Sequence, residues 1–238
     1  MTAPRKVLIV LHQAHSRPGR YGRILRELGY ALDVRRCCVG DTLPKTMDEH
    51  AGVAIFGGPM SANDDCSLDF IKAELDWIPE AVESGKPFLG ICLGAQMLAR
   101  TIGGRVYLHP EGKAEIGYFG MTPTPAAGTM FDGLERVYHW HREGFDLPRK
   151  AVILATGDMF ENQAFRWGKN ALGIQFHGEV TNAMRARWMV RAAHRLSTPG
   201  AQQPDEQIAG QKIHDPKVRV WAKRFLRDWI EGKLSAPR

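Results

Sequence analysis

A cysteine stands at the centre of a glycine-rich segment, Gly90-Ile91-Cys92-Leu93-Gly94. The apolar run Lys86–Ile91 predicts a buried strand, and apolar residues at helical spacing follow the cysteine. Glycines around a nucleophile between a strand and a helix permit a tight turn that lifts the side chain out of the sheet. A helix N-terminus also favours thiolate over thiol. The pattern predicts a nucleophilic Cys92, the alternative being a small buried cysteine at a tight turn.

A histidine and a glutamate occur two residues apart in Gln175-Phe176-His177-Gly178-Glu179. If this segment continues a strand, the side chains of His177 and Glu179 project from the same face. A histidine can accept a thiol proton and return it to a leaving amine, while a carboxylate fixes the orientation of the imidazole. Taken alone, the segment also fits a hydrogen-bonded histidine beside a surface glutamate.

Together with Phe56-Gly57-Gly58-Pro59, these two segments resemble the class I, or triad, glutamine amidotransferase family. In that family Gly-Gly-Pro, G-I-C-L-G-x-Q and Q-F-H-x-E occur in this order with similar separations. The resemblance extends from about Val7 to Leu196. In having no fused domain, the sequence resembles the free-standing members of the family.

The resemblance implies roles for individual residues. The nucleophile, the general acid/base and its orienting partner are, in this order, Cys92, His177 and Glu179. The oxyanion hole consists of the backbone N–H groups of Gly58 and Leu93, the second donor being the residue after the nucleophile. The candidate substrate-binding side chains are Gln96, Trp140, His141 and Arg142. The alternatives are a solvent-facing glutamine at 96 and ordinary core aromatics in the segment Tyr138–His141.

Two positions depart from the family pattern. Most members have proline between the triad histidine and glutamate, where this chain has Gly178. We expect Gly178→Pro to be accepted if the backbone φ there is near −65°. Many relatives follow the histidine of the substrate loop with glycine and aspartate, whereas Arg142 and Glu143 follow it here. An inward-pointing Arg142 would favour an extra substrate carboxylate.

The activity implied by the resemblance is hydrolysis of the glutamine side-chain amide through a cysteine thioester. The ammonia would serve an acceptor or a synthase subunit in trans. The alternative is a hydrolase of γ-glutamyl peptides or γ-glutamyl amines with the same triad. The His-x-Glu pair disfavours a non-enzymatic binding module and a redox-sensing cysteine protein. No phosphate loop, dinucleotide fingerprint or H-E-x-x-H motif is present, so neither a cofactor nor a metal is predicted.

Strand-like and helical segments alternate through the first half of the chain, and this alternation predicts a parallel sheet covered on both faces. The resemblance makes this a three-layer, flavodoxin-like, mostly parallel α/β sheet. The expected strands of this half are Lys6–Leu11, Gly29–Arg36, Gly52–Phe56 and Lys86–Ile91, and the expected helices are Tyr21–Leu28 and 68–82. Short strands are expected between 105 and 175.

The chain divides into an amidotransferase-like domain, residues 1–196, and an extension, residues 197–238. Val180–Leu196 is expected to be helical, Ser197–Gly210 to be a linker, and an amphipathic helix to start near Asp215 and pack on the domain. Residues 181–238 hold 12 Lys and Arg against 5 Asp and Glu, whereas residues 1–180 hold 20 against 21. Such a tail can mark an acidic partner or nucleic acid, but a solvated helix face is favoured and nucleic acid is not expected.

The remaining composition bears on the compartment. The four cysteines include the adjacent pair Cys37 and Cys38 but no metal-type spacing, which favours reduced thiols in a cytoplasm. Cys37, Cys38 and Cys66 have no base nearby in sequence and are expected to be structural. The apolar run Val7–Leu11 is too short for a signal h-region or a membrane span. We therefore expect a cytoplasmic protein with no membrane partner.

Overall fold

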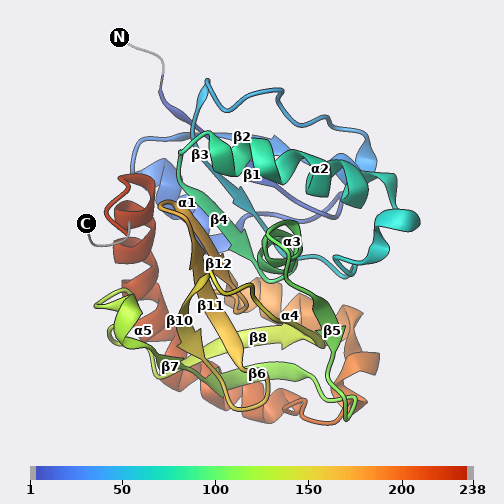
Figure 1. The fold of residues 1–238 in the computed structure, drawn as a ribbon. Coiled ribbons are helices and arrows are strands. Elements are labelled where there is room, and N and C mark those ends of the chain that lie inside the picture. The colour runs from blue at the N-terminus through green and yellow to red at the C-terminus, as the bar shows by residue number, and fades with distance from the viewer. Residues whose placement is uncertain (1–3, 235–238) are drawn as a thin grey trace.

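The computed structural model describes residues 4–234, so the outermost residues of both predicted regions, 1–3 and 235–238, lie outside the description. An eight-stranded sheet forms the centre of the molecule (Figure 1). In spatial order its strands are β2 (Ala31–Arg35), β1 (Lys6–Val10), β3 (His50–Ile55), β4 (Phe88–Ile91), β12 (Ala171–Ile174), β11 (Asn162–Trp167), β10 (Val152–Thr156) and β7 (Thr122–Pro123). Two small sheets pair β5 (Val106–Leu108) with β9 (Glu143–Phe145), and β6 (Glu115–Gly120) with β8 (Arg136–His141). The helices are α1 (Gly19–Glu27), α2 (Asp69–Glu83), α3 (Leu93–Thr101), α4 (Asn182–Arg191) and α5 (Pro204–Ile230).

The five strands from β2 to β12 run parallel, and β11, β10 and β7 continue the sheet antiparallel. The parallel part follows the flavodoxin-like strand order, so the predicted fold class is confirmed. Because β3, β4 and β12 are neighbours with the same direction, their carboxyl ends lie at one edge of the sheet. The three segments Phe56–Pro59, Cys92 and Gln175–Glu179 follow these ends and therefore meet there.

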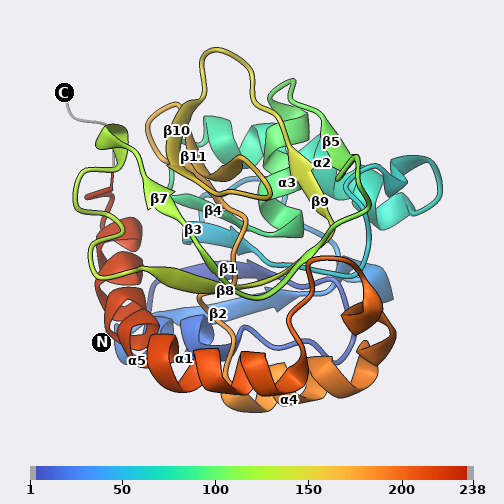
Figure 2. The same ribbon diagram turned by 90° about the horizontal axis from the view of Figure 1, so that it is seen from below.

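Helices cover the two faces of the sheet in separate layers (Figures 1 and 2). The side chains of strand β1 alternate between these two layers: Val7 and Ile9 pack in one core, and Leu8 and Val10 pack in the other. The first core contains apolar residues of α1 and α5, and the second contains those of α2 and α3. Both faces of the sheet are thus buried, as near-continuous apolar strands require.

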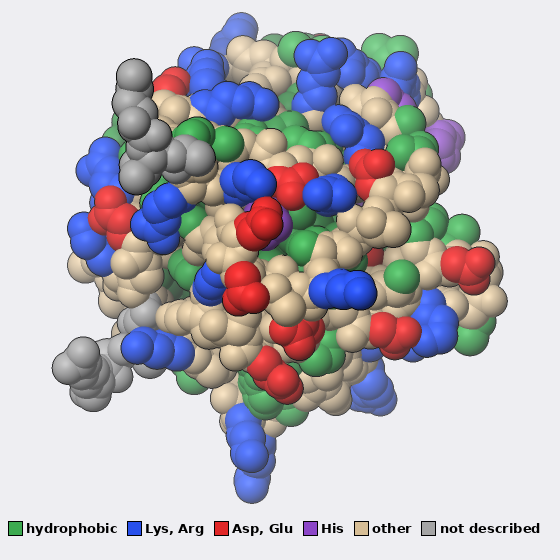
Figure 3. Space-filling view, turned by 90° about the horizontal axis from the view of Figure 1, so that it is seen from above, with side chains coloured by type: hydrophobic (Ala, Val, Ile, Leu, Met, Phe, Trp, Pro, Cys, Tyr) green, Lys and Arg blue, Asp and Glu red, His purple; other side chains and the backbone are tan. Residues whose placement is uncertain are grey.

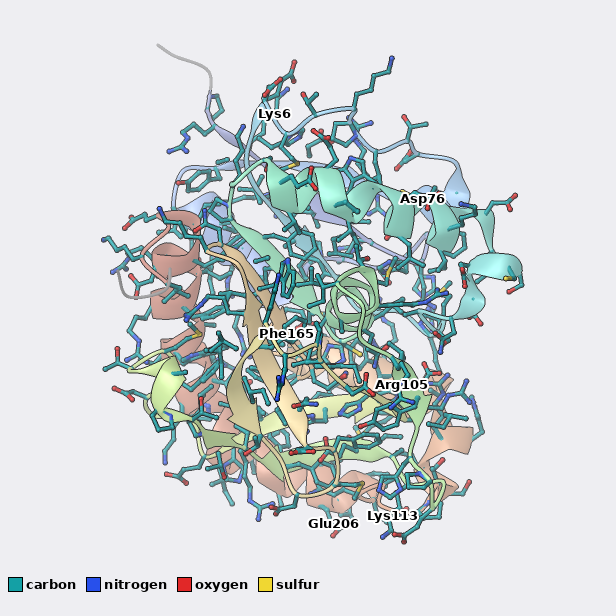
Figure 4. All side chains as sticks on the ribbon, in the orientation of Figure 1. Lys6, Asp76, Arg105, Lys113, Phe165 and Glu206 are labelled. Atoms are coloured by element: carbon teal, nitrogen blue, oxygen red, sulfur yellow. The ribbon has the colours of Figure 1, made fainter. Side chains whose placement is uncertain are left out.

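The interior and the surface separate by residue type. Phe165 on β11 lies in the middle of the molecule with its ring centroid 5.2 Å from that of Phe145, whereas charged residues such as Lys6 and Asp76 lie at the periphery (Figure 4). The face in Figure 3 carries acidic and basic side chains side by side. In the part of the chain described, no helix is both long enough and apolar enough to traverse a bilayer.

The C-terminal region differs from the expected boundaries. Helix α5 begins at Pro204 instead of near Asp215, because Gln203 and Glu206 form a capping box and proline is well tolerated at the first helical position. Residues 204–210 of the expected linker are therefore helical. The expected helix Val180–Leu196 is shorter, since α4 ends at Arg191 and a 3₁₀ turn, Ala193–Ser197, follows. The apolar stripe of α5 is buried in the first core.

Helices α1 and α5 both hold the segment around Gly178. The guanidinium of Arg20 is buried, donates 3.2 Å to the Gly178 carbonyl and forms an ion pair of 2.5 Å with Asp215 of α5. A Cβ atom at position 178 would lie 2.2 Å from the Tyr21 hydroxyl and 2.7 Å from the Trp221 ring. The close approach of these two aromatic residues explains glycine here, and corrects the expectation that proline is acceptable.

We predict that Gly178→Ala lowers the free energy of unfolding by about 1–3 kcal/mol, because the added methyl group overpacks a filled site. Gly120→Ala is the matched control, since the nearest atom to a Cβ there is the Glu135 carbonyl oxygen at 3.9 Å. That control is expected to change stability by no more than about 0.5 kcal/mol. Urea unfolding of both variants measures the difference, and equal stability would show that Tyr21 and Trp221 move away from the added methyl group without cost.

Candidate active site

Cys92 lies at a strained turn between β4 and α3. Its φ is 52° and its ψ −106°, and among residues 4–234 it alone has a positive φ without being glycine. A Cβ at Gly90 would lie 2.4 Å from the Gly94 carbonyl oxygen, and one at Gly94 2.2 Å from the Ile55 carbonyl oxygen. Only glycines therefore fit on either side of the turn. Strain of this kind persists where the surrounding packing imposes it, and it accumulates at functional sites.

The structure brings His177 and Glu179 together, but not on a strand as expected, because β12 ends at Ile174 and residues 175–180 form bends. The Nδ1 atom of His177 is 2.7 Å from Oε1 of Glu179, and both side chains are buried. This contact leaves Nε2 for the Cys92 side chain, whose sulfur lies near enough to raise the pKa of the imidazole. The backbone of Gly57 lies against both groups, since a Cβ there would be 2.9 Å from His177 Cε1 and 3.8 Å from Cys92 Sγ.

The charges around His177 favour its protonated form. Burial lowers the pKa of His177, but the Glu179 carboxylate and the Cys92 sulfur outweigh this and raise it to about 10. The remaining thiols are in other surroundings. Burial, followed by Glu74, raises the pKa of Cys37 to about 12, and burial also raises the pKa of Cys38. Cys66 is exposed and lies in a short 3₁₀ turn.

The two predicted oxyanion-hole residues flank the cysteine. Leu93 is the first residue of α3, so its N–H has no acceptor within the helix and is free to face a ligand. Gly58 lines the cavity above Cys92. A Cβ at Gly58 would lie 3.1 Å from the Leu93 side chain, which shows how closely the two segments approach.

Sequence reasoning missed a buried pair beneath this loop. Nε2 of His12 is 2.9 Å from Oε2 of Glu74, and both side chains are fully buried. Nδ1 of His12 is 3.4 Å from the Gly57 carbonyl oxygen, and its Cβ would be 2.7 Å from a Cβ at Gly58. The pair therefore supports the loop of the oxyanion hole from below. The sequence did offer one indication of this pair: His12 follows directly after the expected first strand, at the carboxyl edge of the sheet.

Of the four predicted substrate contacts, the structure brings only Trp140 to the cavity. The amide of Gln96 is buried and donates to the Glu143 carbonyl and the Gln175 side chain. His141 is buried with Nε2 2.9 Å from Oε2 of Glu115. Arg142 is exposed and does not line the cavity.

The cavity at this site has a volume of about 770 Å³. Cys92 and His177 form part of its lining, and the rings of Trp140 and Trp188 form an aromatic wall. The Trp188 ring packs edge-on against His177 at a centroid distance of 5.0 Å. Six arginines line the same cavity: Arg17, Arg26, Arg36, Arg187, Arg191 and Arg195. Sequence reasoning missed them, although the last three recur at every fourth residue.

One group of side chains within residues 4–234 has the composition of a metal site. Oε2 of Glu115 lies 3.3 Å from Nδ1 of His139 and 2.9 Å from Nε2 of His141, and all three residues are buried. Burial raises the pKa of Glu115, but the two histidines outweigh it and hold it at about 2. The same oxygen also accepts from Gln163, so the group forms a hydrogen-bonded network without an ion. The absence of a metal and of a cofactor stays a prediction.

Residues 21–193 match the family described as glutamine amidotransferase class-I. The glutamine amidotransferase-like protein YfeJ of Salmonella typhimurium is 30% identical over 184 residues, which cover 74% of this chain and 76% of that protein. A glutamine-hydrolysing GMP synthase of Aeropyrum pernix is 28% identical over 172 residues, covering 69% of this chain but 31% of the synthase.

Two solved structures are similar along almost their whole length. A glutamine amidotransferase of Methylobacillus flagellatus superposes with a TM-score of 0.88 at 29% identity, covering 99% of this chain and 97% of that one. A glutamine amidotransferase of Thermotoga maritima gives a TM-score of 0.86 at 30% identity, covering 97% and 100%. The similarity therefore includes the C-terminal helical extension.

The raised pKa of His177 makes a testable contribution to stability. Protonation of this residue stabilises the folded state fully below its ordinary pKa of 6.5, and this contribution is lost as the pH rises towards about 10. Glu179→Gln removes a charge that raises this pKa, so His177 is expected to titrate at lower pH in the variant. NMR titration of the imidazole measures this directly. Exposed Glu83 supplies the control Glu83→Gln, and equal His177 titration in Glu179→Gln and wild type would contradict the assignment.

Proposed function

Because the chain belongs to the class I glutamine amidotransferase family, we propose that it hydrolyses the side-chain amide of a γ-glutamyl compound through a thioester on Cys92. One observation carries this proposal: a cysteine in a strained turn lies beside a buried histidine–glutamate pair at a cavity. Nucleophile, base and orienting carboxylate thus have the relation that covalent acyl transfer requires.

In the first half of the reaction, Sγ of Cys92 attacks the γ-carbonyl carbon of the substrate. A carbon–sulfur bond forms, and the carbonyl oxygen becomes an oxyanion that accepts hydrogen bonds from the N–H groups of Gly58 and Leu93. The carbon–nitrogen bond then breaks as the leaving nitrogen takes a proton from His177. The raised pKa of His177 supports this step, because the imidazolium carries the proton to be donated.

In the second half, water attacks the thioester carbonyl. His177 accepts a proton from this water, the carbon–sulfur bond breaks, and glutamate leaves with the sulfur again as thiolate. Glu179 stays ionised throughout, holds the imidazole by Nδ1 and stabilises its cation. The reaction requires no redox change and no metal-bound nucleophile.

Glutamine is the first candidate substrate, with ammonia as the released amine. The relatives named GMP synthase are described as glutamine-hydrolysing, and this chain spans about a third of their length. We propose by analogy that ammonia from this protein passes to an acceptor enzyme, a synthase subunit in trans. A cytoplasmic location fits the four unpaired cysteines of the described residues.

A γ-glutamyl amine or γ-glutamyl peptide is the second candidate. The size of the cavity favours it, because about 770 Å³ lies in the upper part of the range for drug-sized ligands. The cavity therefore has room for a leaving group far larger than ammonia. The triad and its chemistry are the same for both candidates.

We predict that the purified chain releases glutamate from glutamine or from γ-glutamyl peptides, and that Cys92→Ser lowers kcat at least about a thousandfold. Cys66→Ser is the control, because that thiol is exposed and outside the cavity. Steady-state release of glutamate and of the leaving amine measures both variants. Turnover in Cys92→Ser equal to that of the wild type would exclude the thioester mechanism.

A further inference from the structure

The cavity above Cys92 has an unbalanced charge. Six arginines line it, whereas Glu179 is its single acidic lining residue and is already paired with His177. Within residues 4–234, none of the six guanidinium groups forms an ion pair with a carboxylate. The face in Figure 3 is different, because there acidic and basic side chains alternate. Uncompensated cations in a concave site concentrate a positive field and attract anions.

The arginines come from two parts of the chain. Arg187 and Arg191 are one turn apart on α4 and so share a face of that helix, and Arg195 of the following 3₁₀ turn lines the same cavity. Arg17, Arg26 and Arg36 come from the loop before α1, from α1 and from the end of β2. A ligand in the cavity thus meets guanidinium groups from both parts of the chain.

Arg195 connects this basic lining to the catalytic centre. It is half-buried, and burial together with the neighbouring Arg142 lowers its pKa. The Cys92 sulfur lies close enough to oppose that shift. An anionic ligand at Arg195 would relieve the repulsion between the two arginines while lying near the nucleophile.

Glutamine does not account for these charges. It carries one carboxylate, which a single arginine satisfies, and one ammonium group, which the others repel. Guanidinium groups are suited to planar, bidentate binding of carboxylate and phosphate. The remaining arginines therefore fit anionic groups on the other side of the scissile amide, in the leaving amine.

We propose that the cavity accepts γ-glutamyl compounds whose leaving amine carries carboxylate or phosphate groups, and that Arg191 and Arg195 bind these groups. This inference rests on the proposed γ-glutamyl amide hydrolysis and specifies its substrate class. The aromatic wall of Trp140 and Trp188 adds a surface for the apolar part of the leaving group.

The test uses pairs of substrates that differ in the negative charge of the leaving amine. γ-Glutamyl-glutamate is compared with γ-glutamyl-glutamine, which replaces one carboxylate by an amide, and γ-glutamyl-phosphoethanolamine with γ-glutamyl-ethanolamine. The full chain is expected to prefer the more anionic member of at least one pair by about tenfold or more in kcat/KM, because hydrogen bonds between guanidinium and carboxylate or phosphate are stronger than those to a neutral group. The two pairs distinguish carboxylate from phosphate. Raising the salt concentration is expected to weaken the preference.

Variants connect the preference to the two arginines. In the double variant Arg191→Gln, Arg195→Gln the ratio of kcat/KM for the more anionic to the less anionic member of a pair is expected to fall towards one. The single variant Arg191→Gln is expected to change this ratio in the same direction if the double variant does not fold. Arg227→Gln, an exposed arginine of α5 outside the cavity, is expected to keep the wild-type ratio.

Three results would overturn the inference. Hydrolysis of all four compounds by the wild type without a charge preference refutes the substrate class alone and leaves the proposed function standing. That result is also expected if the arginines dock an acidic protein. A preference that persists in the arginine variants removes Arg191 and Arg195 from the site. No hydrolysis of glutamine or of any of the four compounds refutes the proposed function, and this inference with it.

Discussion

The backbone of Cys92 is the constraint on which the site depends. Its positive φ is unfavourable for a residue with a side chain, and it persists because Gly90 and Gly94 permit a contact that no larger residue allows. The turn places the sulfur at the carboxyl edge of the sheet and the Leu93 N–H at the start of α3. The proposed nucleophile and the proposed oxyanion donor are thus fixed by the same few dihedral angles.

The other half of the triad depends on packing from outside the sheet. Arg20 binds the Gly178 carbonyl and Asp215, and Trp221 closes over the glycine. Helix α5 therefore supports the strand end that carries His177. Loss of one partner from a buried ion pair typically costs about 3–5 kcal/mol, so the support is energetically substantial. The extension packs as part of the same body as the sheet, since its apolar stripe is continuous with the core.

Much of the fold, and the meeting of Cys92 with His177 and Glu179, could be predicted from sequence because the determinants are local. The G-x-C-x-G segment contains its own turn, and His177 and Glu179 follow the end of the neighbouring strand β12, although the bends of residues 175–180 replace the expected strand. The substrate contacts depend on how distant segments pack, which no short motif encodes. His141 matches a family pattern yet packs on Glu115, whereas the arginines of the cavity come from four separate segments. The early start of α5 depended on a Gln203 cap, which is weaker in sequence than serine or aspartate.

A covalent γ-glutamyl enzyme is the central claim of this account, and trapping it is the most direct test. Hydroxylamine competes with water for a thioester, so the wild-type chain turning over glutamine or a γ-glutamyl peptide should form γ-glutamyl hydroxamate. Acid-quenched enzyme should carry a γ-glutamyl group that peptide mapping places on Cys92. Turnover that produces glutamate with no hydroxamate and no modified Cys92 would contradict the account, because water would then attack the amide directly.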